Sequence, residues 1–306
     1  MLHVTLRQLQ VFEAVARHLS FSRAAEELHL TQPAVSMQIR QLEASVGLPL
    51  FEQIGKKIFL TEAGNEVYHY SRSIAQQLTE AEAVLSEMKG LRRGRLNISV
   101  VSTANYFAPQ LLALFCQRNQ DVTLSLKVVN REELLHQLAS NEMDLGVMGQ
   151  PPEGLDIVAE PFMENPLVVV APPSHPLVTE RDIPLSRLAQ ETFIVREQGS
   201  GTRSAMERFF QQHGLNLATG MEMSTNEAIK QAVQAGMGLG VVSVHTIALE
   251  LETRRLVVLD VESFPILRHW YVIHRKGKRL SAMAQAFKDF LLKEATQVMQ
   301  PASQQA

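Results

Sequence analysis

The sequence is poor in the features that mark secreted and membrane proteins. It contains a single cysteine, Cys116, among 306 residues, which excludes an internal disulfide framework and fits a reducing compartment. The apolar helical pattern around Cys116 favours a buried structural thiol over a redox sensor. No apolar run is long enough to span a bilayer, and no signal-peptide pattern begins the chain. We therefore expect a cytoplasmic globular protein of two or three domains.

A strong net charge is also absent. The chain carries −3 overall, which does not mark it as a nucleic-acid binder. Residues 1–95 hold 11 Lys and Arg against 10 Asp and Glu, a net charge of +1, whereas the remainder holds 18 against 22, a net charge of −4. The N-terminal part is thus the less acidic one. If it binds DNA, shape, register and dimerisation must contribute as well as charge.

The stretch SFSRAAEELHLTQPAVSMQIRQLE, residues 20–43, is the most informative segment of the chain. Ser20 and Thr31 are placed to cap two short helices, and Pro33 falls in the first turn of the second helix, where its missing N–H costs nothing. His29 and Leu30 form the turn between the helices. One stripe of the second helix is apolar, namely Val35, Ile39, Leu42 and Val46. This layout is typical of a helix-turn-helix with a recognition helix.

The polar face of the second helix and the segment that follows it supply the candidate DNA contacts. Gln can pair with adenine, Ser with a base or phosphate, and Met or Pro with a thymine methyl group. In LFEQIGKKIFLTEAG, Gly55 with two lysines indicates the tip of a basic wing. The alternatives are an ordinary amphipathic hairpin and a solvated turn. The candidates are Ser22, Arg23, Thr31, Gln32, Pro33, Ser36, Met37, Arg40, Lys56 and Lys57.

The run FEAVARHLSFSRAAEELHLTQPAVSMQIRQLEASVGLPLFEQIGKKIFLTEAG resembles the N-terminal winged helix-turn-helix of LysR-type transcriptional regulators. The chain length also suits that family. One residue departs from the pattern, because many members have arginine where Gln53 stands, so phosphate contacts of the wing are expected to depend on Lys56 and Lys57. The resemblance implies a winged head over residues 1–61, double-stranded DNA with an inverted repeat as partner, and contact with RNA polymerase.

Residues 62–91 are predicted to form one long helix. This stretch lacks proline, and Val67, Ile74, Leu78, Ala81, Leu85 and Met88 follow a heptad seam. The narrow apolar stripe favours pairing with a second copy of the helix, although packing on its own domain is the alternative. The resemblance agrees, since a linker helix dimerises the DNA-binding heads in this family, and it favours a homotetramer over a homodimer. Lys89 to Arg95 is interpreted as a hinge.

Residues 92–306 alternate short apolar strands with amphipathic helices, which predicts parallel α/β sheets buried on both faces. A helix is expected from Ser102 or Thr103 to about Asn119, a strand at LVVLDV, and a disordered tail from MQPASQQA onward. The length favours two lobes with crossovers near 162–166 and 265–268. Lobe I then spans about 95–163 and 268–296, and lobe II about 164–267. This two-lobed architecture is that of periplasmic binding proteins, as in LysR-type effector domains.

A ligand is expected where strands end and helices begin in these sheets. The strongest segment is QGSGTR, residues 198–203, because its glycines expose backbone N–H groups and Arg203 adds charge. Each such loop could also be a capped turn that binds nothing. The candidates for binding a small anionic effector are Ser102, Thr103, Asn105, Asn130, Arg131, Gly149, Gln150, Gly199, Ser200, Gly201, Thr202, Arg203 and Asn226.

Two long runs narrow the resemblance. EQIGKKIFLTEAG in the wing, and the stretch from Tyr106 to Pro152, are similar to LysR-type regulators of Calvin-cycle operons, those encoding ribulose bisphosphate carboxylase. That similarity implies a phosphorylated metabolite or a nicotinamide nucleotide as effector, with no bound cofactor. It leaves the effector's identity, the operator and the direction of regulation open.

Enzyme interpretations find little support in the sequence. Gly236, Gly238 and Gly240 form a GxGxG, but a helix precedes and a strand follows it, the reverse of a dinucleotide-binding turn. No GxSxG motif, metal-ligand spacing or matched acid and base is present. We therefore predict an α/β protein with an all-α head that acts as a ligand-responsive transcriptional regulator. The alternative is a solute-binding protein or small-molecule enzyme with an N-terminal helical interaction module.

Overall fold

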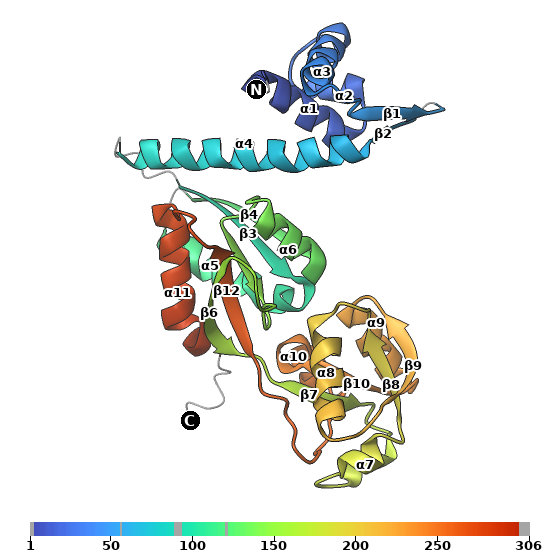
Figure 1. Cartoon of the computed structure of the whole chain (residues 1–306). Helices are drawn as coiled ribbons and strands as arrows, with labels where there is room; N and C mark the ends of the chain where they lie inside the picture. The colour runs from blue at the N-terminus through green and yellow to red at the C-terminus, as the bar shows by residue number, and fades with distance from the viewer. Residues whose placement is uncertain (1–2, 56, 89–93, 120–121, 300–306) are drawn as a thin grey trace. The chain divides into compact units, whose positions relative to one another are not determined.

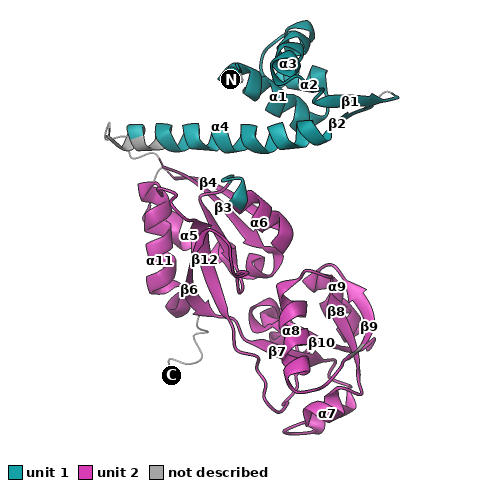
Figure 2. Ribbon diagram, in the orientation of Figure 1, with its two compact units in different colours: residues 1–89, 139–142 teal, residues 90–138, 143–306 magenta. Residues whose placement is uncertain are grey.

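The computed structural model describes residues 3–55, 57–88, 94–119 and 122–299. The chain divides into two units, residues 1–89 with 139–142 and residues 90–138 with 143–306 (Figure 2). Three predictions lie outside the described residues. They concern Lys56, most of the hinge (residues 89–93) and the tail beyond Met299.

The head of the first unit contains three helices and a two-stranded wing (Figure 1). The helix-turn-helix and the wing lie where the sequence predicts them. The side-chain oxygen of Ser20 accepts a hydrogen bond from the backbone N–H of Arg23, and that of Thr31 accepts one from Ala34. These bonds satisfy N–H groups that have no partner within the helix. The elements are α1 (Leu6–His18), α2 (Phe21–Glu27), α3 (Gln32–Val46), β1 (Phe51–Ile54) and β2 (Lys57–Leu60).

One compact core holds the head together. Val35, Ile39 and Leu42 of α3 are buried against α1 and α2, and the small Ala24 lets the helices approach closely. The carboxylate of Glu43 accepts the backbone N–H of Leu50 at 2.8 Å. The start of the wing is therefore tied to the end of α3, which fixes the wing beside the recognition helix.

Helix α4 (Glu62–Met88) is the long helix that the sequence predicts. Its first turns belong to the head, because Val67 packs against the head core. Farther along, Leu78 and Leu85 are exposed by 40% and 56%. Two leucines in register on a heptad seam are thus left partly uncovered by the described residues.

Each lobe of the second unit contains a five-stranded sheet, and both sheets are mixed rather than parallel. In the first lobe, β3 runs parallel to β4 and β5, but β12 runs antiparallel to β5 and β6. The order is β4-β3-β5-β12-β6, formed by β3 (Gly94–Val101), β4 (Val122–Val129), β5 (Leu145–Met148), β6 (Ile157–Glu164) and β12 (His269–Arg275).

The second lobe repeats this mixture. Strand β10 is parallel to β8 and antiparallel to β7. The order is β11-β7-β10-β8-β9, formed by β7 (Leu167–Ala171), β8 (Thr192–Arg196), β9 (Ala218–Met223), β10 (Leu239–Ser243) and β11 (Val257–Val258). The prediction of parallel sheets was wrong because hydrophobic pattern reports burial, not direction. Strands β7 and β12 each follow a crossover between the lobes and not a helix of their own lobe, and both run antiparallel to their neighbours.

Two other expectations need correction. The helix expected from residue 102 to 119 is split into η1 (Ser102–Tyr106) and α5 (Ala108–Arg118). Pro109 explains the break, because proline lacks the N–H that would continue a helix from the preceding turn. The strand expected at LVVLDV is reduced to β11, beyond which Val261 forms only an isolated bridge with Ile183.

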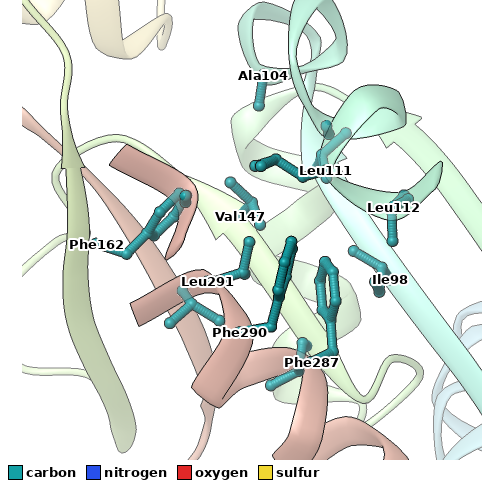
Figure 3. Close-up of a cluster of buried hydrophobic side chains, with 14 of the residues drawn as sticks. Ile98, Ala104, Leu111, Leu112, Val147, Phe162, Phe287, Phe290 and Leu291 are labelled. Atoms are coloured by element: carbon teal, nitrogen blue, oxygen red, sulfur yellow. The ribbon is translucent and has the colours of Figure 1, made fainter. Parts of the chain in front are cut away.

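Helices cover both faces of each sheet. Helices α5 and α11 (Ala282–Met299) pack on one face of the first-lobe sheet, where Phe287 and Phe290 fill the core (Figure 3). Helix α6 (Arg131–Ala139) covers the other face. In the second lobe, α7 (Leu185–Leu188) and α8 (Gly201–Gln212) lie opposite α9 (Asn226–Gln234) and α10 (Ala248–Glu252). No described helix is both long and apolar enough to cross a membrane.

Candidate DNA-binding face and effector cavity

The outward face of α3 is polar and groove-shaped. Gln32 and Arg40 are exposed, and Met37 is 52% exposed. The side-chain amide of Gln32 donates to the hydroxyl of Ser36 at 3.0 Å, so these two side chains are held in register one turn apart. The groove is lined by Gln32, Pro33, Ser36, Met37, Arg40, Gln41 and Ala44. This face presents the donor, acceptor and apolar groups that base edges match.

The remaining candidates for DNA contact surround α3. Ser22 and Arg23 are exposed on α2, Thr31 is the cap of α3, and Lys57 is exposed at the start of β2. Gln53, which stands where many LysR-type regulators have arginine, has a structural role in the wing. Its side-chain amide donates to the carbonyl of Gly55 at 3.0 Å and so supports the wing tip.

A small cavity of about 40 Å³ lies between the two lobes of the second unit. Three of its walls begin where β3, β4 and β8 end and where η1, α6 and α8 begin, as expected for ligand sites in such sheets. The lining residues are Val101, Ser102, Thr103, Asn130, Arg131, Gly149, Asn165, Arg196, Glu197, Ser200, Gly201, Thr202, Arg268 and Trp270.

The N-terminus of α8 has backbone N–H groups that an anion could approach. Asn130 caps α6 by accepting the N–H of Glu133 at 2.8 Å. By contrast, no side chain caps α8, although Ser200 stands at the capping position. The first N–H groups of an uncapped helix attract negative charge. The buried hydroxyl of Thr202 lies in the same wall.

Five of the predicted effector residues do not line this cavity. Asn105 and Gly199 are exposed, and the carbonyl of Gln150 accepts a hydrogen bond from Arg131. Arg203 points elsewhere, because its guanidinium pairs with Glu207 at 2.7 Å and with Glu222.

Asn226 lies behind the cavity wall. Its amide oxygen accepts from Arg196 at 2.7 Å, and its nitrogen donates to Thr103 at 3.4 Å. The other eight predicted residues line the cavity together.

Several lining residues were not identified from the sequence. Three of them, Asn165, Arg268 and Trp270, carry a buried N–H group that has no hydrogen-bond partner among the described residues. The amide oxygen of Asn165 accepts from Ser243 at 2.8 Å, which directs its N–H₂ group away from that hydroxyl. Asn165 and Arg268 lie in the two predicted crossovers between the lobes. The sequence signal that could have identified these two residues was the presence of polar side chains in the crossovers.

The charges around the cavity are unequal. Arg196 is neutralised by Glu197 through two hydrogen bonds of 2.6 and 2.7 Å. Arg131 and Arg268 form no ion pair among the described residues and donate instead to the carbonyls of Gln150 and Gly201. Burial lowers the pKa of Arg268 to about 10, helped by the charges of Arg208 and Arg131. Arg268 therefore stays protonated at neutral pH, and the cavity carries a net positive charge.

Polar contacts join the lobes at one end of the cavity. The hydroxyl of Tyr106 from the first lobe donates to Glu227 of the second at 2.7 Å. Lys230 lies 2.7 Å from Glu227 and 2.9 Å from Glu250. Burial opposes ionisation of Glu227, but the hydrogen bonds from Lys230 and Tyr106 outweigh it and lower its pKa. Within this network, the Tyr106–Glu227 hydrogen bond links the first lobe to the second.

Comparison with known proteins identifies the architecture. Residues 6–65 match the family described as bacterial regulatory helix-turn-helix protein, lysR family, and residues 89–296 match the LysR substrate binding domain. The chain belongs to the LysR family. It is thus a DNA-binding transcriptional regulator whose second unit is the family's effector-binding domain.

Named relatives of this LysR regulator span nearly its whole length. It is 62% identical over 297 residues to the RuBisCO operon transcriptional regulator of Allochromatium vinosum, covering 97% of this chain and 98% of that one. It is 50% identical to the transcriptional regulator CbbR of Rhodospirillum rubrum, covering 94% and 95%.

Two solved structures are informative. The regulatory domain of CcmR from Synechocystis, in complex with 2-PG, matches with a TM-score of 0.63 and 44% identity, over 65% of this chain and 96% of that one. Full-length CbnR in complex with its target DNA matches with a TM-score of 0.72 over 94% and 99%, but at 21% identity. The second likeness concerns the fold alone.

Family membership decides between the regulator and the enzyme interpretations. In this LysR regulator, Gly236 and Gly238 lie in the turn between α9 and the buried strand β10, and Gly240 is within that strand. The described residues also contain no cluster of three or more His, Cys, Asp or Glu side chains that could hold a metal ion.

Proposed function

We propose that this LysR regulator controls carbon-fixation genes in response to a small phosphorylated anion bound between its lobes. The observation that carries the proposal is the donor-rich cavity. Three buried N–H groups without partners, an uncapped helix N-terminus and two unpaired arginines surround a space of about 40 Å³. An anion would accept hydrogen bonds from these groups and also balance the charges of the two arginines, which a neutral molecule does not.

The relatives support the same assignment. Two regulators at 62% and 50% identity are named for the RuBisCO operon or as CbbR, and the CcmR domain at 44% identity binds 2-PG. This ligand, 2-phosphoglycolate, combines a phosphate and a carboxylate on two carbons. We therefore take it as the first probe for this cavity.

The exposed face of α3 and the wing are proposed to bind an inverted repeat in the promoter, two heads per repeat. The uncovered leucines of α4 support pairing of the heads through this helix, in a dimer or tetramer. Such a protein acts in the cytoplasm, where it meets both the promoter and RNA polymerase. Effector binding would change the relative geometry of the lobes and thereby the way the DNA is bent.

Calorimetry tests the cavity. Wild-type protein is titrated with 2-phosphoglycolate beside Thr202→Val, which keeps the shape of Thr202 but removes its hydroxyl. We expect Thr202→Val to bind about tenfold more weakly, as for the loss of one hydrogen bond to a charged group. Binding to the promoter without effector should be unchanged.

Thr202→Ser, which retains the hydroxyl, is the matched control and should restore most of the affinity. Wild-type affinity in Thr202→Val would reject this cavity as the effector site. Equal binding to the promoter and to random duplex would reject the regulatory role proposed here.

A further inference from the structure

A second, larger hollow lies beside the effector cavity in the same unit. It is an open groove of about 650 Å³ between α8 and the segment that precedes β12. Arg131 and Arg268 line both the cavity and the groove. A Cβ atom added at Gly201 would lie 3.5 Å from the guanidinium of Arg131, so this shared arginine lies against the start of α8. The groove is therefore a continuation of the cavity.

Arg208 is the third cation of this groove. It lies on the face of α8 that also carries Gly201 and Ser204, because residues three, four and seven apart share a helix face. Its Nε donates to the carbonyl of Ser204 at 3.1 Å, one turn closer to the helix N-terminus. With a rise of about 1.5 Å per residue, Ser204 lies only about 5 Å along the axis from Gly201. The guanidinium of Arg208 thus turns back toward the cavity.

The three arginines lack counter-charges. No ion pair joins Arg131, Arg208 or Arg268 to a carboxylate within the part of the chain that the structure describes. Glu153 also lines the groove but is exposed. Burial and the charge of Arg208 lower the pKa of Arg131, and Arg208 likewise lowers that of Arg268. Three clustered cations repel one another unless an anion lies among them. The buried, unpartnered Nε of Arg268 points to the same need.

We propose that Arg208, with Arg131 and Arg268, forms a second anion subsite in the groove. This inference rests on the proposed function, because the first subsite is the cavity at the N-terminus of α8. The second subsite takes a phosphate or carboxylate group. That group is either the far end of a ligand whose first phosphate occupies the cavity or a separate anion. The regulator would then select ligands with two anionic groups a few ångströms apart.

A pair of matched probes isolates this subsite. 2-Phosphoglycolate carries a carboxylate that ethyl phosphate, of the same length, lacks. Full-length wild-type protein, Arg208→Gln and the control Arg181→Gln are titrated with each probe by calorimetry. Arg181 is a surface arginine of the same lobe, with a side chain 84% exposed, and lies outside the groove.

We expect wild-type protein to prefer 2-phosphoglycolate by tenfold or more. Arg208→Gln should reduce that preference about tenfold, as for one charge-assisted hydrogen bond, while binding of ethyl phosphate stays within twofold. Arg181→Gln should behave as wild type. A stoichiometry of two ethyl phosphates in wild-type protein, falling to one in Arg208→Gln, would identify a separate anion as the occupant and also support the subsite.

The inference and the proposed function fail in different ways. If Thr202→Val weakens binding about tenfold but Arg208→Gln leaves both probes unaffected, or weakens both equally, the second subsite is overturned and the cavity assignment stands. If wild-type protein binds neither probe, the effector assignment fails and this inference fails with it.

Discussion

Individual side chains fix the local geometry of the head before any DNA is bound. Arg17 and His18 at the end of α1 both contact Glu27 at the end of α2, at 2.5 and 2.6 Å. The sequence places these residues on separate helices and gives no indication that they meet. The contact holds the angle between α1 and α2, on which α3 is packed.

The pH dependence of this contact has a definite sign. Hydrogen bonds from Arg17 and His18 lower the pKa of Glu27 to about 2 from its ordinary 4.5. A lowered folded-state pKa stabilises the fold above pH 4.5, and this contribution disappears as the pH falls toward 2. Because Glu27 is 39% exposed, solvent screening limits the gain to about 1 kcal/mol at most.

Glu27→Gln should therefore lower the protection of the α1 and α2 amides against hydrogen exchange at pH 7. The decrease of this protection between pH 4.5 and pH 2 should be smaller than in wild type. Hydrogen exchange of the full-length protein measures both. Glu26→Gln, at the neighbouring exposed residue, serves as the control. A pH profile of Glu27→Gln identical to that of wild type would contradict the assignment.

Single residues of the DNA-binding face should separate specificity from affinity. Gln32→Ala or Ser36→Ala should reduce discrimination against a mutated operator by about 1–3 kcal/mol, the range for a base contact. Lys57→Ala should weaken binding to every duplex and reduce the salt slope by about 1. Anisotropy titrations at several salt concentrations measure both effects, with the exposed effector-domain Lys127→Ala as control. An unchanged salt slope in Lys57→Ala would remove the wing from the interface.

At the scale of elements, the sequence predicted most of the head correctly. Caps, turn residues and apolar spacing located α2 and α3, because these signals are local. Heptad spacing located α4. The alternation of strands and helices was predicted, but β6 and β9 were not identified from the sequence. The sheets are mixed rather than parallel, since strand direction depends on which connection crosses between the lobes. Pro109 could have signalled the division between η1 and α5.

Two glycines show how one element constrains another. A Cβ at Gly64, in the first turn of α4, would lie only 2.0 Å from the carbonyl oxygen of Leu50. Gly47, which ends α3 with a φ of +77°, has open space around it. Gly64→Ala should destabilise the head by about 3 kcal/mol through backbone displacement. Gly47→Ala should cost only about 1 kcal/mol of left-handed strain.

Denaturant unfolding of the two variants, followed by the helical signal, measures the difference. An equal loss of unfolding free energy in both variants would contradict the close contact between Gly64 and the carbonyl of Leu50.

For the whole molecule, we expect assembly to depend on the uncovered part of the α4 seam, where Leu78 and Leu85 are exposed. Leu78→Glu with Leu85→Glu should dissociate the oligomer, because each leucine contributes about 1.5–3 kcal/mol on full burial. The two changes together should weaken dimerisation at least about a hundredfold, with helix content retained. Sedimentation equilibrium measures the association. Gln77→Glu, at an exposed position of the same helix, adds a like charge off the seam. An unchanged oligomer in the double variant would exclude α4 as the pairing element.

The candidate effector site was only half accessible to sequence reasoning. Loops at helix N-termini were found because the change from a strand to a helix is visible along the chain, and eight of the predicted residues line the cavity together. Asn165 and Arg268 were missed because they lie in crossovers, about one hundred residues apart, that only folding brings to one place. Arg203 was predicted on charge alone, but Glu207 and Glu222 compete for it.

By itself, the sequence determined the order of the units, the recognition helix, the long helix of α4 and the general position of the ligand loops. These depend on periodicity and capping, which act over a few residues. Tertiary structure alone decided the strand directions and the excess of positive charge around the cavity, where Arg131 and Arg268 meet. Charge balance at a site is a sum over groups from distant segments, and it becomes defined only when the chain has brought them together.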